Sequence, residues 1–200
     1  MNGLVLYIGL GLGLALAAGV RPFLPALLAG ALASSKVLGV SFAVGDYTFL
    51  YSGWWLAAVA VGLVLAYLVQ WRLGSERFET GQPAAVLAGI GIGVGALLFA
   101  GTLAAHNDVA WPGLIGGAGA AALAQAVVRP LSMRTRARLP DRGAREAVTI
   151  YLDSVSLALA ALVALLHPLG YVAVALFAWL WLRMRARSQE KYAGLRILRR

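Results

Sequence analysis

Apolar segments, each about the length of a membrane crossing, alternate along the chain with short polar or charged stretches. A transmembrane helix needs about 20 predominantly apolar residues, with a range of about 17 to 25. Seven segments approach this length, at residues 3–20, 22–40, 54–71, 84–105, 114–128, 148–166 and 169–182. The pattern predicts an all-α fold, a polytopic membrane helix bundle of about seven transmembrane helices that forms a single domain over residues 1–200.

The composition agrees with a membrane protein and excludes several kinds of site. Hydrophobic residues make up 61% of the chain and charged residues 12%, whereas a soluble domain carries about 25% charged residues. There is no cysteine, which excludes disulfides and thiolate chemistry. Because His106 and His167 lack the spacing of metal ligands, we expect no bound metal and no cofactor.

Most lysines and arginines gather in the stretch 134–145 and in the tail 184–200. Cationic loops beside apolar spans stay in the cytoplasm, so these stretches, with Arg72 and Arg77, are predicted to be cytoplasmic. This explains their charge better than nucleic-acid binding does, and we expect anionic lipid head groups as partners at this face. If residues 22–40 cross the membrane fully, as we expect, the N-terminus lies outside and the C-terminus inside. If they only re-enter, the N-terminus lies inside.

A glycine-rich pattern occurs twice. IGLGLGLALAAG, at residues 8–19, aligns without a gap with IGIGVGALLFAG, at residues 90–101. The sequence therefore predicts one repeat over residues 1–73 and a second over residues 84–166. An extra helix at 169–183 and a basic cytoplasmic tail at 184–200 follow the second repeat. An odd number of spans separates equivalent points, so the two units would be inverted, an arrangement typical of transporter folds.

The same glycines have a second predicted role in helix packing. Small residues four apart let helix backbones approach closely in lipid. Three pairs have this spacing: Gly9 and Gly13, Gly91 and Gly95, and Gly113 and Gly117.

Charged and polar residues inside membrane spans are functional candidates, because burying them in lipid is costly. Arg21 precedes Pro22, and Pro25 follows shortly after. Proline removes a backbone donor and disfavours helix at the preceding residue, so the pattern predicts a helix break with a cation at its hinge. A snorkelling arginine at the interface would give the same pattern.

The acidic candidate is Asp153, about two turns into the span 148–166, with Ser154 and Ser156 beside it. On the predicted topology Arg21 and Asp153 both lie toward the cytoplasmic half. We therefore expect an ion pair between them.

Four further polar residues are weaker candidates for transport or binding. Lys36 interrupts or ends the second segment, and His106 and Asp108 lie in a polar outer turn. Gln125, in the segment 114–128, is placed to donate a hydrogen bond across helices.

The stretch AAGVRPFLPALLAG, at residues 17–30, resembles a bacterial family of integral membrane proteins, domain of unknown function 4126. FLYSGWW before the third span, the glycine-rich fourth span and the ending KYAGLRILRR add to the resemblance. It implies a multi-pass protein of the bacterial cytoplasmic (inner) membrane and no particular activity.

The sequence as a whole predicts a small transporter or channel for an ion or a small polar solute, anionic if Arg21 faces the path. The alternatives are a scaffold that binds a partner or lipid without transport, and a flippase for lipid head groups. Enzyme motifs such as HExxH, GxSxG and a phosphate loop are absent, so we expect no catalytic residues. Assembly into a homo-oligomer is left open.

Overall fold

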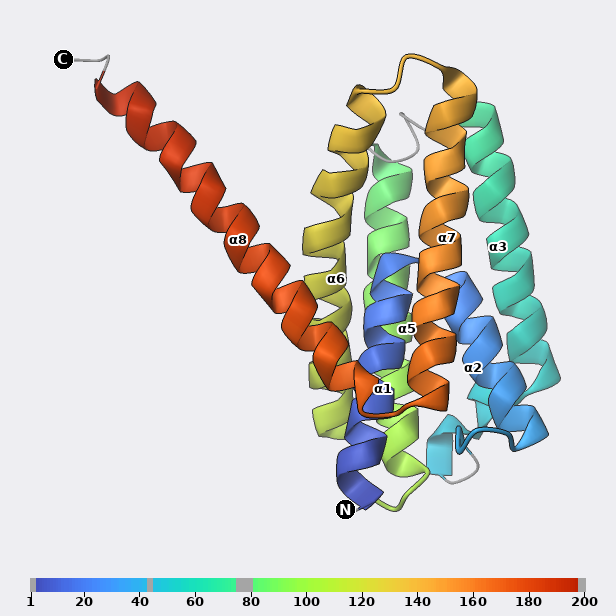
Figure 1. The fold of residues 1–200 in the computed structure, drawn as a ribbon. Helices are drawn as coiled ribbons and strands as arrows, with labels where there is room; N and C mark the ends of the chain where they lie inside the picture. The colour runs from blue at the N-terminus through green and yellow to red at the C-terminus, as the bar shows by residue number, and fades with distance from the viewer. Residues whose placement is uncertain (1–2, 43–44, 75–80, 198–200) are drawn as a thin grey trace.

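A computed structural model describes residues 3–42, 45–74 and 81–197 of the chain. Arg77 and the last three residues lie outside this part, as do the side chains of Arg142 and of residues 187–197. The described residues form helices and no strands (Figure 1). These are α1 (Gly3–Val20), α2 (Phe23–Ser35), the 3-10 helix η1 (Gly45–Tyr51), α3 (Gly53–Leu73), α5 (Gln82–Ala104), α6 (Trp111–Ala137), α7 (Arg142–Leu165) and α8 (Leu169–Ile197).

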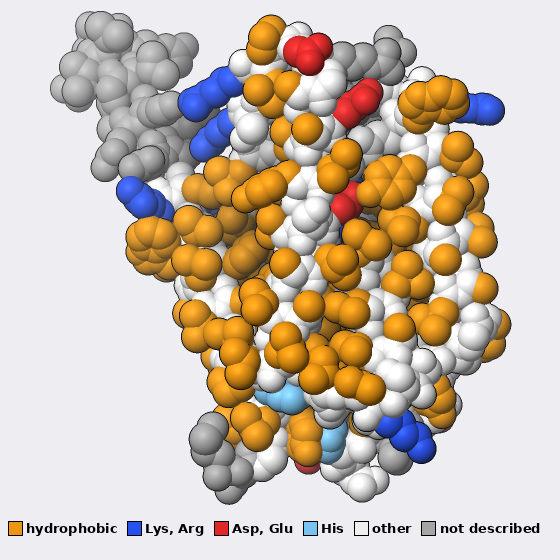
Figure 2. Space-filling model, turned by 45° about the vertical axis from the view of Figure 1, so that its right-hand side comes forward, with side chains coloured by type: hydrophobic (Ala, Val, Ile, Leu, Met, Phe, Trp, Pro, Cys, Tyr) orange, Lys and Arg blue, Asp and Glu red, His pale blue; other side chains and the backbone are white. Residues whose placement is uncertain are grey.

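The predicted all-helical membrane bundle is confirmed, with a smaller number of long helices than predicted. Six described helices are long and apolar enough to cross a membrane: α1, α3, α5, α6, α7 and α8. The predicted second span is the shorter helix α2, whose 13 residues cover about 20 Å of a hydrocarbon core about 30 Å thick. Figure 2 shows hydrophobic side chains over most of one face, with charged side chains toward its two ends.

When the short α2 is counted, successive α-helices run in alternating directions (Figure 1). One end of the bundle carries the end of α3, the start of α5 and the α6–α7 loop. We call it the basic end, because Arg72 and the stretch 134–145 lie there. The N-terminus lies at the opposite end. Helices α1 and α2 form a hairpin whose turn stops well short of the basic end (Figure 1). The turn, and Arg21 with it, therefore lies part-way along the bundle.

The break between α1 and α2 follows from Pro22. The Arg21 amide makes the last helical bond of α1, to the Ala17 carbonyl at 3.1 Å. Pro22 has no amide hydrogen to continue the ladder to Ala18. Helix α2 then begins at Phe23. The predicted helix break is confirmed at this position.

Glycines bring α1, α5 and α6 into backbone contact. A Cβ at Gly95 would lie 3.1 Å from the Ala15 carbonyl oxygen, and one at Gly91 would lie 3.1 Å from that of Ala18. A Cβ at Gly113 would lie 2.7 Å from the Cα of Ala100. A side chain at these positions would press against the neighbouring helix, so the glycines allow the close spacing of the bundle core.

The remaining predicted packing glycines lie at equally close contacts. A Cβ at Gly117 would collide with the Gly95 carbonyl oxygen, and one at Gly13 with the Val163 side chain. At Gly9 it would lie 2.5 Å from the His167 carbonyl oxygen, where α8 begins. Each of the three predicted pairs therefore contributes to a helix contact.

Candidate functional site

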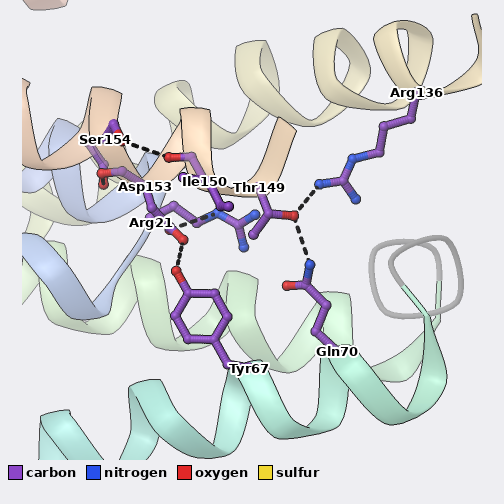
Figure 3. Close-up of polar contacts among 9 residues, drawn as sticks. Arg21, Tyr67, Gln70, Arg136, Thr149, Ile150, Asp153 and Ser154 are labelled. Atoms are coloured by element: carbon purple, nitrogen blue, oxygen red, sulfur yellow. Dashed lines mark hydrogen bonds and ion pairs between the residues drawn. The ribbon is translucent and has the colours of Figure 1, made fainter. Parts of the chain in front are cut away.

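The predicted ion pair between Arg21 and Asp153 is present. The Arg21 Nε atom lies 3.3 Å from the Asp153 Oδ1 atom (Figure 3). The α1–α2 break presents Arg21 from within the bundle, and α7 presents Asp153. Asp153 lies about 16 Å along the helix axis from Arg142 at the start of α7, so the pair lies at membrane depth.

Four residues extend this pair into a polar cluster. The Tyr67 hydroxyl, on α3, donates to the Asp153 Oδ2 atom. One turn along α7, the Thr149 hydroxyl oxygen accepts from Gln70 Nε2 and from Arg136 Nη2, each at 2.8 Å (Figure 3). We call Arg21, Tyr67, Gln70, Arg136, Thr149 and Asp153 the polar cluster.

Three members of the polar cluster are buried, whereas Tyr67 is 40% exposed. Thr149 is 1% exposed, Arg136 7% and Asp153 8%. The cluster contains two guanidinium groups and one carboxylate. Buried charges require partners, since leaving one unpaired costs several kcal/mol. Asp153 pairs with Arg21, and the Thr149 hydroxyl accepts a hydrogen bond from Arg136.

A cavity of about 80 Å³ lies against Arg21 on the side of α5 and α6. It is large enough for several water molecules. A smaller cavity of about 20 Å³ lies on the other side of Arg21 and borders Tyr67, Gln70, Thr149 and Asp153. Arg21 therefore separates two spaces inside the bundle.

The larger cavity has the polar lining expected for an anion. Its wall includes Arg21, Arg129, Gln125 and Ser132, and none of the described residues that line it is acidic. Arg129 is exposed on α6. Guanidinium groups bind carboxylate and phosphate oxygens in a two-pronged geometry. The cavity can therefore receive a small anion or an anionic group.

The other residues predicted around this site have structural partners. Gln125 donates a hydrogen bond to the Ala88 carbonyl at 2.8 Å, as expected for a contact between helices. Ser156 is buried and donates to the Asp153 carbonyl. Ser154 lies exposed and bonds its own helix at Ile150. Pro22 and Pro25 are buried at the break.

Lys36, His106 and Asp108 lie toward the N-terminal end of the bundle, away from the polar cluster. Lys36 is exposed and ends α2 in a left-handed conformation, with a φ of 57°. The His106 ring stacks on Tyr7, and its Nδ1 atom lies 2.9 Å from the Thr102 carbonyl oxygen. Asp108 is exposed. The structure therefore gives these three residues no place beside Arg21.

His167 lies in the turn between α7 and α8, also near the N-terminal end. Burial lowers the pKa of His167, and the positive charge of the nearby His106 lowers it further, while a hydrogen bond to the Leu38 backbone partly opposes the shift. No pattern along the chain predicted that the two histidines would lie near each other. Among the described residues no group of three metal-ligating side chains occurs.

Five residues at this site were not predicted from the sequence. They are Tyr67, Gln70, Arg129, Arg136 and Thr149. One signal was available for Thr149, because residues four apart share a helix face and Thr149 precedes Asp153 by one turn. Tyr67 and Gln70 lie near a span end, where polar aromatic and amide residues are common. Arg136 was grouped with the basic stretch 134–145, and Arg129 was not singled out.

No family model, curated protein or solved structure matches the chain. The resemblance to domain of unknown function 4126 therefore stays a prediction.

Proposed function

We propose that the protein is a small membrane transporter or channel for an ion or a small polar solute, with an anion as the favoured substrate. One observation carries the proposal: Arg21 lies at a helix break inside the bundle, against a cavity that a second arginine, Arg129, also lines. An arginine at this depth is expensive to maintain for packing alone.

Each part of the site has a role in this proposal. Arg21 attracts the anion, and Asp153, which accepts a hydrogen bond from Tyr67, pairs with the guanidinium group while the site is empty. Because Pro22 interrupts the helix, the short α2 is the element that shifts when the ion pair loosens. The cavities on both sides of Arg21 then form two parts of one path.

The repeat and the topology belong to the same proposal. Helices α1, α2 and α3 run in directions opposite to α5, α6 and α7 (Figure 1), as an inverted repeat requires. In this arrangement α1 and α2 are the first two segments of the first repeat, and they form a hairpin whose tip lies part-way along the bundle. The basic end faces the cytoplasm of a bacterial inner membrane, and the N-terminus lies outside.

A scaffold without transport is the alternative. It predicts a dry and closely packed bundle, whereas the cavity against Arg21 favours a ligand. The residues of the site offer no nucleophile with an adjacent base, so an enzyme is not proposed.

Ion flux through proteoliposomes tests the proposal. We expect the purified protein to conduct chloride, nitrate or phosphate faster than potassium. Arg21→Ala should reduce anion flux about ten-fold, as expected for loss of a charge-assisted contact. Asp153→Asn should also change the flux.

Arg134→Gln is the matched control, because Arg134 is an exposed arginine on α6 that does not line the cavity. Folding of each variant is checked by size-exclusion chromatography and circular dichroism. Absence of flux for every tested ion would favour the scaffold.

A further inference from the structure

We infer that the anion is the phosphate head group of a negatively charged phospholipid, which enters the Arg21 cavity sideways from the bilayer between α5 and α6. This inference rests on the proposed function and names its substrate class.

A groove on the outer surface of α5 and α6 adjoins the cavity. It has a volume of about 400 Å³, and its wall consists of Ile92 on α5 and Ala122, Gln125, Ala126, Arg129, Pro130 and Met133 on α6. Gln125, Arg129 and Met133 line both the groove and the Arg21 cavity. The two spaces therefore adjoin at an arginine.

The groove runs from the basic end toward the middle of the bilayer, as a lipid chain does. Ile92 lies about 15 Å along α5 from Gln82 at the basic end, which is half of a hydrocarbon core about 30 Å thick. Arg129 lies nearer the basic end of α6 than Ala122 does. A lipid in the groove would thus place its head group at Arg129 and its chain beside Ala122 and Ile92.

The polar groups at the junction match a phosphate ester. Arg21 and Arg129, which come from different helices, both line the cavity, and so do the polar side chains of Gln125 and Ser132. Pro130 has no amide hydrogen to bond the Ala126 carbonyl, so the groove also offers a backbone acceptor to a hydroxyl of the head group. A small inorganic anion would use the arginines but not the apolar groove.

A second apolar cleft, between α6 and α7, also borders the cavity, through Val128, Ser132 and Leu152. No arginine or lysine is among the described residues that line it. Charge complementarity therefore favours the groove on α5 and α6.

The experiment uses the fact that the chain has no cysteine. A single Ala126→Cys substitution places a fluorescent label in the groove, where Ala126 is exposed. The matched control is Val64→Cys on α3, which is 57% exposed and lies outside the groove. Each labelled protein is placed in vesicles that contain brominated phosphatidylglycerol or brominated phosphatidylcholine, and quenching is measured.

We expect the label at Ala126 to prefer brominated phosphatidylglycerol about five-fold, and the label at Val64 to show no preference. A factor of five corresponds to one arginine near an anionic surface. Adding Arg129→Gln to the Ala126→Cys protein should remove the preference, Arg129→Lys should retain part of it, and Arg134→Gln should leave it unchanged.

Three outcomes would overturn the inference: equal quenching by both lipids at Ala126, the same preference at Val64, or a preference that survives Arg129→Gln. Quenching does not measure the flux of small anions. The lipid inference can therefore fail while the proposed transport stands. If inorganic phosphate is transported by a protein without lipid preference, the substrate is a free anion.

Discussion

The glycine core of α1, α5 and α6 and the polar cluster hold the bundle together in opposite ways. In the glycine core, Gly91, Gly95 and Gly117 place backbone against backbone, and a side chain at any of them would collide with an atom of another helix. In the polar cluster, Arg21, Asp153 and their neighbours connect α3, α6 and α7 to the α1–α2 break through hydrogen bonds and one ion pair.

The difference separates the fixed part of the bundle from the part that can rearrange. A helix in the glycine core cannot slide without a steric clash, because packed interiors tolerate little displacement. A guanidinium or carboxylate group can exchange one partner for another, including a ligand. The α2–α3–α7 side is therefore where we expect movement, and α1, α5 and α6 form the frame for it.

The largest expected effect comes from filling the glycine core. Gly117→Leu should lower the free energy of unfolding by about 3 kcal/mol, because a Cβ there meets the Gly95 carbonyl oxygen and lies 2.8 Å from the Ala96 Cα atom. Gly119→Leu on the same helix is the control, since a Cβ at Gly119 meets nothing within 4 Å. Unfolding in detergent measures both, and equal losses would remove the distinction between frame and surface.

The next effect tests the polar cluster. The Arg21 and Asp153 side chains are 15% and 11% exposed, so Asp153→Asn should cost about 2 kcal/mol, between the values for surface and buried pairs. Asp153→Arg should cost more, and Arg21→Asp in the same chain should recover part of the loss. A double-mutant cycle measures the coupling, and additive losses would mean that the two charges do not interact.

The smallest effect tests whether protonation of His167, next to Gly9 of α1, lowers the stability of the protein. The His167 carbonyl oxygen contacts Gly9, and burial lowers the pKa of His167 below its ordinary value of 6.5. The unfolded chain then binds a proton at higher pH than the folded protein does. The stability that the neutral ring contributes is present above pH 6.5 and is lost as the pH falls toward the lower, folded pKa.

We therefore expect the melting temperature to be lower at about pH 5.5 than at about pH 7.5, and His167→Gln to reduce that difference. If His167→Gln leaves the pH dependence unchanged, other groups cause it.

Local patterns in the sequence predicted the first helix of the frame and the ion pair between Arg21 and Asp153, but not the other residues of the polar cluster. Helix α1 has the predicted bounds of residues 3–20 because Pro22 stops the helix whatever surrounds it. The Arg21–Asp153 pair was predictable because few charges occur in the spans and each needs a partner.

The rest depended on tertiary structure. The predicted segment at 114–128 is only part of α6, which continues past Arg129 and Pro130 as far as Ala137. Hydropathy marks the part of a helix that suits lipid, while the helix continues as far as its hydrogen bonds allow. Tyr67 and Arg136 joined the cluster only because α3 and α6 lie beside α7, which spacing along the chain does not show.

The position of Arg21 at the tip of the α1–α2 hairpin also has a consequence for biogenesis. Arg21 leaves the ribosome before its partner Asp153, and residues 22–152 take about ten seconds to synthesise. An arginine at the centre of a span costs about 2.5 to 3.5 kcal/mol on the insertion scale. The hairpin must therefore bear that cost, or wait at the interface, until α7 supplies the carboxylate. The insertion of the first two helices is in this way tied to the arrival of one of the last.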